Sequence, residues 1–163
     1  MDESELARYI KLFHRTVYRA ALGLLHNAAE AEDATQETFV KLFEHNKHFT
    51  SDEHCKAWLL RVVINHSKNV LRSFRYARTE ELDEAIPVED LAESDLADAL
   101  EALPTKYRAV IHLHYFEGYS AKEIAEILNI STTAVTTRLA RGREKLRNLM
   151  TQEEKLYKTP MLL

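Results

Sequence analysis

The sequence is poor in the residues that break helices and in cysteine. Its 163 residues include 3 glycines, 3 prolines and 1 cysteine. Proteins built from strands and tight turns use more glycine than this, so the composition favours helices. The single cysteine, Cys55, excludes a framework of internal disulfides. We therefore expect an all-α protein.

The chain also lacks long apolar runs and the short motifs of common enzymes. No apolar stretch approaches the roughly 20 residues that a membrane-spanning helix requires. The start, MDESELARYIK, does not have the basic-then-apolar order of a signal peptide. A glycine-rich phosphate loop, an HExxH metal helix and a paired nucleophile and base are all missing. We expect a cytoplasmic protein with no membrane insertion, no cofactor and no enzymatic activity.

The charges are distributed unevenly along the chain. The formal net charge is −4, which by itself argues against nucleic-acid binding. However, residues 79–103 contain ten acidic residues and no lysine or arginine. Residues 56–78 contain six basic and no acidic residues, and residues 138–147 contain five basic residues and one acidic residue, Glu144. Two basic segments on either side of an acidic connector indicate a protein that attracts phosphate.

Apolar residues recur at intervals of three and four, which is the pattern of amphipathic helices. The predicted helices are residues 4–26, 29–44, 53–74, 95–102, 105–116, 121–128 and 132–150. The period is lost between residues 45 and 53, where Asn, Thr, Ser and Asp accumulate. This composition predicts a loop that ends in a helix cap at Ser51 or Asp52.

The same pattern predicts two small helical domains joined by a linker. The first domain covers residues 1–78 and the second covers residues 92–150. Residues 79–91 are acidic, contain Pro87 and have few apolar side chains, so we expect a mobile linker there. We expect residues 151–163 to be a disordered tail.

Residues 120–139, SAKEIAEILNISTTAVTTRL, have the pattern of a helix-turn-helix. Ser120 and Glu123 fit a capping box, and residues 129–131 fit a tight turn. A trihelical unit of this kind places its last helix in the major groove of DNA. The side chains of that helix expected to contact bases and phosphates are Thr132, Thr133, Thr136, Thr137, Arg138, Arg141 and Arg143. The alternative is a helical hairpin whose basic face is only solvated.

Three segments resemble sigma factors, the subunits that give bacterial RNA polymerase its promoter specificity. LPTKYRAVIHLHYFEGYSAKEIAEILNISTTAVTTRLARGREKLRNL (103–149) resembles the fourth conserved domain of that family. AEDATQETFVKLFEH (31–45) resembles the polymerase-binding helix of the second domain, and CKAWLLRVVINHSKNVLRSFRY (55–76) resembles its promoter-melting helices. The short connector, without a third domain, points to the extracytoplasmic-function (ECF) group. The resemblance implies a protein that directs transcription initiation.

In this family one helix of the second domain docks on the coiled coil of the polymerase β′ clamp. The resemblance assigns this contact to Asp33, Gln36, Glu37 and Lys41. The first three are spaced three and four apart, so they share one helix surface. Acidic side chains suit a basic partner. From the charge pattern alone, a solvated helix face is the alternative.

The loop that follows residue 45 and the next helix resemble the part of the family that reads the −10 element as single-stranded DNA. By position, Phe49 corresponds to the loop aromatic beside the captured base, and Asn65 to a helix residue that contacts this base. The resemblance implies that the DNA backbone is held by Arg61, Lys68, Arg72 and Arg75. Aromatic rings beside cations suit unpaired bases, because stacking contributes about 1–3 kcal/mol per base. Alternatively, Phe49 belongs to a small core under the loop, and Trp58 is expected in the core.

The resemblance also implies the partners. These are core RNA polymerase, with the β flap as a second candidate contact, promoter DNA with its −35 element read as duplex, and an anti-sigma factor. The family usually carries Lys or Arg where this chain has Thr136, which leaves the −35 sequence open. The chief alternative is a stand-alone helix-turn-helix regulator that binds duplex DNA as a dimer. A helix-turn-helix recombinase and an anti-sigma-like interaction protein are less favoured.

Histidines gather around the only cysteine. His45, His48, His54 and Cys55 match no familiar zinc spacing, so no metal site is predicted. Nothing marks a resolving partner for Cys55, which is therefore expected to be an ordinary thiol and not a redox sensor. For the acidic linker, a solvated tether is preferred to occupation of the RNA exit path or mimicry of nucleic acid.

Overall fold

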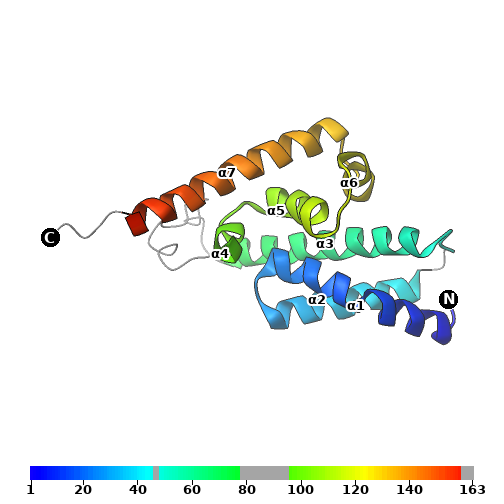
Figure 1. The fold of residues 1–163 in the computed structure, drawn as a ribbon. Helices are drawn as coiled ribbons and strands as arrows, with labels where there is room; N and C mark the ends of the chain where they lie inside the picture. The colour runs from blue at the N-terminus through cyan, green and yellow to red at the C-terminus, as the bar shows by residue number, and fades with distance from the viewer. Residues whose placement is uncertain (46–47, 78–95, 159–163) are drawn as a thin grey trace. The chain divides into compact units, whose positions relative to one another are not determined.

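The computed structural model describes residues 1–45, 48–77 and 96–158, and every element of secondary structure within these ranges is a helix. The all-α prediction is therefore confirmed. The helices divide into two compact units, one containing α1 to α3 and the other built mainly from the helices of the C-terminal half (Figure 1). The predicted acidic linker, residues 79–91, lies outside the described residues. No helix in the described ranges is both long enough and apolar enough to span a membrane.

The first unit is built from three helices that pack against one another: α1 (Glu3–Leu25), α2 (Ala28–Glu44) and α3 (Asp52–Ala77) (Figure 1). Each begins at a short polar side chain that accepts a hydrogen bond from the first turn, which satisfies an otherwise unpaired N–H group. These caps are Asp2, Asn27 and Ser51. The core includes Val17, Leu24, Leu42, Leu59, Val63 and Ile64, each no more than 1% exposed.

The second unit contains α4 (Leu96–Glu101), α5 (Thr105–Ile111), a π-helical turn η2 (His112–Phe116), α6 (Ala121–Leu128) and α7 (Thr132–Lys158). The helix predicted over 105–116 is present, but its last turn is π-helical and not α-helical. There the N–H of Glu117 donates to the carbonyl of His112, five residues back, and the side chains of His112 and Glu117 also meet at 3.6 Å. The wider turn leaves Tyr115 and Phe116 55% and 58% exposed.

The ends of α6 and α7 follow the predicted pattern closely. Ser120 Oγ accepts from the N–H of Glu123 at 3.2 Å, and the Glu123 carboxylate accepts from the N–H of Ser120 at 3.0 Å. The backbone N–H of Ser120, and after it the Ser120 side chain, favour the ionised form of the Glu123 carboxylate and so lower its pKa. Ser131 caps α7 through the N–H of Ala134. α7 continues to Lys158, which corrects the predicted helix end near Met150 and the disorder expected for 151–158.

Glycine and asparagine occupy positions between and within the C-terminal helices that need special backbone geometry. Gly118, after η2, has a φ of 77°, and Asn129, between α6 and α7, has a φ of 56°. Gly142 serves a different purpose, because a Cβ atom there would lie 2.8 Å from Ile111 Cδ1 and 3.2 Å from Tyr107 Cβ. The absence of a side chain at Gly142 lets α7 approach α5 closely.

Candidate nucleic-acid interfaces

The loop before α3 holds its aromatic residue within a cluster of rings. The Phe49 ring lies 5.8 Å from Trp58, 5.8 Å from His45, 5.2 Å from His54 and 6.1 Å from Tyr9, measured between centroids. Phe49 and Trp58 are both half-buried. Phe49 therefore has the packing expected of a small core under the loop, while part of its ring remains accessible. The two interpretations of Phe49 are compatible in this geometry.

Hydrogen bonds within the loop define its shape. The His54 Nδ1 atom accepts from the N–H of Thr50 at 3.2 Å, and Ser51 Oγ accepts from the N–H of His54 at 3.1 Å. The first contact requires a lone pair on Nδ1, so it selects the His54 ring with this nitrogen unprotonated. Together these bonds connect the end of the loop to the first turn of α3.

Helix α1 supports the same loop from a distant part of the sequence. Tyr9 is 5% exposed and contacts Phe49 edge to face. Its neighbour Arg8 forms an ion pair with Asp52, in which Nη2 lies 2.7 and 2.9 Å from the two carboxylate oxygens, and the Arg8 guanidinium lies over the Tyr9 ring. This carboxylate raises the pKa of Arg8, and burial raises the pKa of Tyr9. The start of α3 is thereby fastened to the start of α1.

Cys55 lies beneath this region as an unreactive thiol. Its side chain is fully buried, and burial, followed by the negative charge of Asp52, raises the pKa of Cys55 to about 12. Thiolate is the reactive form, so this environment suppresses redox chemistry. No group of three or more His, Cys, Asp or Glu side chains placed to hold a metal ion occurs in residues 1–45, 48–77 and 96–158.

A polar and cationic stripe runs along α3 from the ring cluster. Arg61, Asn65, Lys68 and Arg72 are spaced four, three and four apart, so they share one face of the helix. Arg61, Asn65 and Arg72 are exposed and Lys68 is half-buried. Arg75 continues the spacing on the same helix. Trp58 precedes Arg61 by three positions, so the rings adjoin the N-terminal end of this stripe.

The exposed face of α2 combines acidic and apolar side chains. Asp33, Gln36, Glu37 and Lys41 are all exposed, as expected for a docking surface. One and two turns farther along, Val40 and Phe43 are 49% and 50% exposed. The spacing of residues 33, 36, 37, 40 and 43 places them on one side of the helix. The apolar half of this face was not part of the sequence prediction.

The helix-turn-helix leaves most of its predicted contact residues accessible. Thr132, Thr133, Thr136 and Arg141 are exposed on α7, and Thr137 and Arg138 are half-buried. The opposite side of α7 is held in the core by Val135 and Leu139, which are 0% and 4% exposed. The structure therefore presents one threonine-rich side of this helix to solvent.

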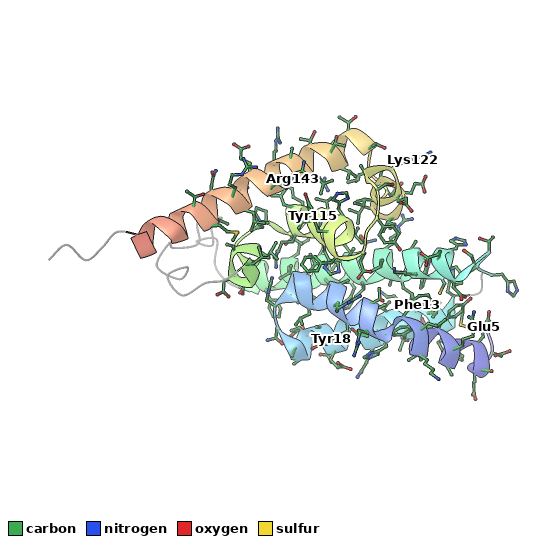
Figure 2. All side chains as sticks on the ribbon, viewed as in Figure 1. Glu5, Phe13, Tyr18, Tyr115, Lys122 and Arg143 are labelled. Carbon is green, nitrogen blue, oxygen red and sulfur yellow. The ribbon has the colours of Figure 1, made fainter. Side chains whose placement is uncertain are left out.

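Arg143 has a different environment from the other predicted DNA contacts. Its guanidinium donates to the Tyr115 hydroxyl at 3.0 Å, and Figure 2 labels both residues. The two side chains line an open apolar groove of about 560 Å³ in the second unit. The other principal lining residues are Leu96, Leu100, Ile111, Phe116, Leu146, Arg147 and Met150. In the sequence, the adjacent aromatic residues of η2 were only a weak sign of this groove.

Comparison with known proteins identifies both units. Residues 9–76 match the family Sigma-70 region 2, and residues 94–146 match Sigma-70, region 4. The chain is 31% identical over 166 residues to the ECF RNA polymerase sigma factor SigW of Bacillus subtilis strain 168, and the match covers 90% of this chain and 89% of that protein.

Two solved structures share the fold. One is the sigma factor RpoE in complex with the anti-sigma factor NepR from Bartonella quintana, with a TM-score of 0.71 and 22% identity over 90% of this chain and 97% of that chain. The other is CnrH in complex with the cytosolic domain of CnrY, with a TM-score of 0.70 and 28% identity over 92% of this chain and 90% of that chain.

These findings define the class of the protein as a sigma factor of the sigma-70 family, because the region 2 and region 4 matches occur in order on two helical units. Within that class, the chain belongs to the ECF RNA polymerase sigma factors. The resemblance noted in the sequence is confirmed.

Proposed function

We propose that this ECF sigma factor binds core RNA polymerase and directs initiation by reading the −35 element as duplex DNA and the −10 element as single-stranded DNA. In this proposal the protein has no catalytic residue and acts in the cytoplasm. The observation that carries the proposal is the pairing of two different surfaces. In the first unit, the aromatic rings of Phe49 and Trp58 lie next to the row of cationic side chains on α3. In the second unit, the last helix of the helix-turn-helix exposes polar side chains.

The first unit has the chemistry needed to hold an unpaired strand. Removing a base from the stack costs a few kcal/mol, so a protein that opens DNA must stabilise the extruded base. Phe49 offers the accessible part of its ring, and Asn65 offers an amide on the neighbouring stripe. Arg61 and Arg72 are exposed cations on the same face and would neutralise phosphates.

The α2 face supports docking on core polymerase. Asp33 and Glu37 suit a basic surface, and the exposed Val40 and Phe43 add apolar area that a partner would remove from water. We assign this face to the β′ coiled coil. The apolar groove beside η2 is the surface that we assign to the β flap, because an exposed Phe116 and Leu96 suit an apolar helix.

An anti-sigma factor is the third proposed partner. One of the two similar solved structures is of a sigma factor in complex with an anti-sigma factor, and the other is of CnrH in complex with the cytosolic domain of CnrY. Exposed apolar residues on α2 and η2 are costly for a free protein to leave in water. A partner that covers them would keep the sigma factor from polymerase.

The decisive experiment adds the purified full-length chain to core RNA polymerase and sequences the 5′ ends of transcripts from a genomic DNA template. Initiation at a restricted set of promoters with shared −35 and −10 sequences is expected. Core polymerase alone is the control, and Glu37→Lys should lose association with core because it reverses a charge on the docking face. Random start sites, or no association of the unaltered chain with β′, would refute the proposal.

Phe49→Ala tests strand capture separately from docking. Removal of the ring should abolish most promoter opening, detected by permanganate reactivity of unpaired thymines, and leave binding to core polymerase unchanged. Phe49→Tyr keeps the ring and is the matched control, with opening close to that of the unaltered protein. Loss of core binding in Phe49→Ala would instead assign the ring a purely structural role.

The alternative of a stand-alone dimeric regulator is not favoured by the family assignment. It predicts tight, sequence-specific binding to duplex DNA in the absence of polymerase, with two half-sites related by symmetry. Footprinting of the isolated protein on the promoters selected above separates the two models of action. A symmetric footprint without polymerase would support the regulator.

A further inference from the structure

Small uncharged side chains line the exposed side of α7 between Thr133 and Ala140. Thr133, Thr136 and Ala140 are exposed, and Thr137 is half-buried beside them. These four positions are separated by three or four residues, so they form one surface of the helix. This surface, residues 133, 136, 137 and 140, is called the threonine face below. It is opposite the side that Val135 and Leu139 bury in the core.

The hydroxyl group of Thr136 already has a partner within the helix. Its Oγ1 atom donates to the carbonyl of Thr133 at 3.0 Å. The only hydrogen of the hydroxyl is used in this bond, so Thr136 has no donor left for a base. What it presents outward is a methyl group and the remaining acceptor capacity of its oxygen. Ala140, one turn farther along, presents a methyl group alone.

Arg141 and Arg143 lie on the two flanks of the threonine face. Arg141 and Arg143 are two residues apart, which places them about 200° apart around the helix. One flank carries Arg141, which is exposed, and on the other Arg143 donates to Tyr115. Arginines on both flanks suit the two phosphate backbones that border a groove, and leave the bases to the small side chains between them.

We propose that the threonine face reads thymine methyl groups in the major groove, so that the −35 element contains A·T pairs opposite Thr136 and Ala140. This inference rests on the proposed function, because it assumes that α7 enters the groove. Of the base edges in the major groove, thymine alone carries a methyl group, and threonine methyl and alanine side chains are its usual protein partners. Guanine is read by arginine or lysine, which the threonine face lacks.

The test begins with the sequences that the holoenzyme selects. Core polymerase reconstituted with the full-length chain is used to select duplexes from a library with a randomised −35 region. At least two selected positions should be A·T pairs in one orientation. Each of these thymines is then replaced by deoxyuridine, which removes the methyl group and keeps every hydrogen-bonding atom of the base.

Each contacted methyl group should contribute about a fourfold change in affinity, the factor that corresponds to burial of one methylene-sized group. Deoxyuridine at a thymine of the spacer between the two elements is the control and should have no effect. Two variants then assign the contact. Thr136→Val keeps the methyl group and should retain the preference for thymine over uracil, whereas Thr136→Ser loses the methyl group and should abolish that preference at one position.

The outcomes separate this inference from the proposed function. Selection of a defined −35 sequence that binds equally well with thymine or uracil would overturn the inference and leave the proposed function intact. Selection of G·C pairs at the positions affected by Thr136 variants would also overturn it. If no −35 sequence is selected at all, the proposed function fails, and the inference fails with it.

Discussion

The loop before α3 and the helix α7 present the residues proposed to contact DNA in opposite ways. In the loop, Phe49 depends on rings from other elements, and one of them, Tyr9, comes from 40 positions earlier in the chain. On α7, the positions of Thr133 and Thr136 depend only on the helix that carries them, and the Thr136 hydroxyl donates to the carbonyl of Thr133. A surface of the first kind is lost when a distant residue changes, whereas a surface of the second kind is lost when the helix is moved or unfolded.

This difference suits the two proposed tasks. An unpaired strand has no regular shape, so the protein must provide a preformed binding surface, in which aromatic rings are held in place by packing and hydrogen bonds. Duplex DNA already supplies a groove of constant geometry, and a straight helix with small side chains is sufficient to enter it. Changes in one unit should therefore leave the surface of the other unit intact.

Tyr9→Ala should have the largest effect, and it should be confined to the first unit. Removal of a buried aromatic ring costs about 3 kcal/mol of unfolding free energy, and here it also withdraws support from Phe49. Hydrogen exchange measured residue by residue should increase across α1 and the start of α3 and remain unchanged in α5 and α7. Tyr9→Phe keeps the ring and should behave nearly as the unaltered chain. Faster exchange in α7 would contradict the independence of the two surfaces.

Gly142→Val is the corresponding change in the second unit. A branched side chain would meet Ile111 and Tyr107 at distances shorter than normal contact, which costs about 1–3 kcal/mol and shifts α7 away from α5. Binding to −35 duplex should become weaker. Initiation from a template that is already melted at the −10 element should not change. Gly142→Ala is the milder control, because its gain in helix propensity of about 1 kcal/mol offsets part of the strain. Normal −35 binding by the valine variant would show that α7 tolerates displacement.

Ser120→Ala should have an intermediate effect through the cap of α6. It removes the hydroxyl that accepts from the N–H of Glu123, at a cost of about 1 kcal/mol. The measurement is denaturant unfolding followed in the second unit. Ser73→Ala is a suitable control, because Ser73 is exposed within α3 and bonds only its own helix. Equal destabilisation by both variants would contradict a specific role for the capping box.

The ion pair between Arg8 and Asp52 should have the smallest effect on stability, because both side chains are about half exposed and solvent screens the pair. We expect the ion pair to matter mainly because it positions the loop before α3. Arg8→Met and Asp52→Asn should each reduce promoter opening, and the double variant should be no worse than either single one. Raising the salt concentration should diminish the difference between the unaltered chain and the variants. Additive losses would mean that the two residues act separately.

Sequence reasoning located the helices, the caps and the helix-turn-helix because these features depend on neighbours within one turn. Ser120 with Glu123, Ser51 with His54 and Ser131 with Ala134 are all pairs three residues apart. The stripe on α3 also followed from spacing, although its roles in DNA binding remain predictions. The π-helical turn at 112–116 was missed, since its contact between His112 and Glu117 spans five residues and has no periodic signature.

Interactions over three or four positions fix which residues share a helix face and where the helices begin, so these features could be read from the amino-acid sequence. The rings around Phe49, the pairing of Asp52 with Arg8 44 positions away, and the contact of Arg143 with Tyr115 28 positions away emerged from the packing of the helices. The physical reason is that such contacts depend on how helices pack, and many pairings of apolar faces are compatible with one pattern of apolar residues.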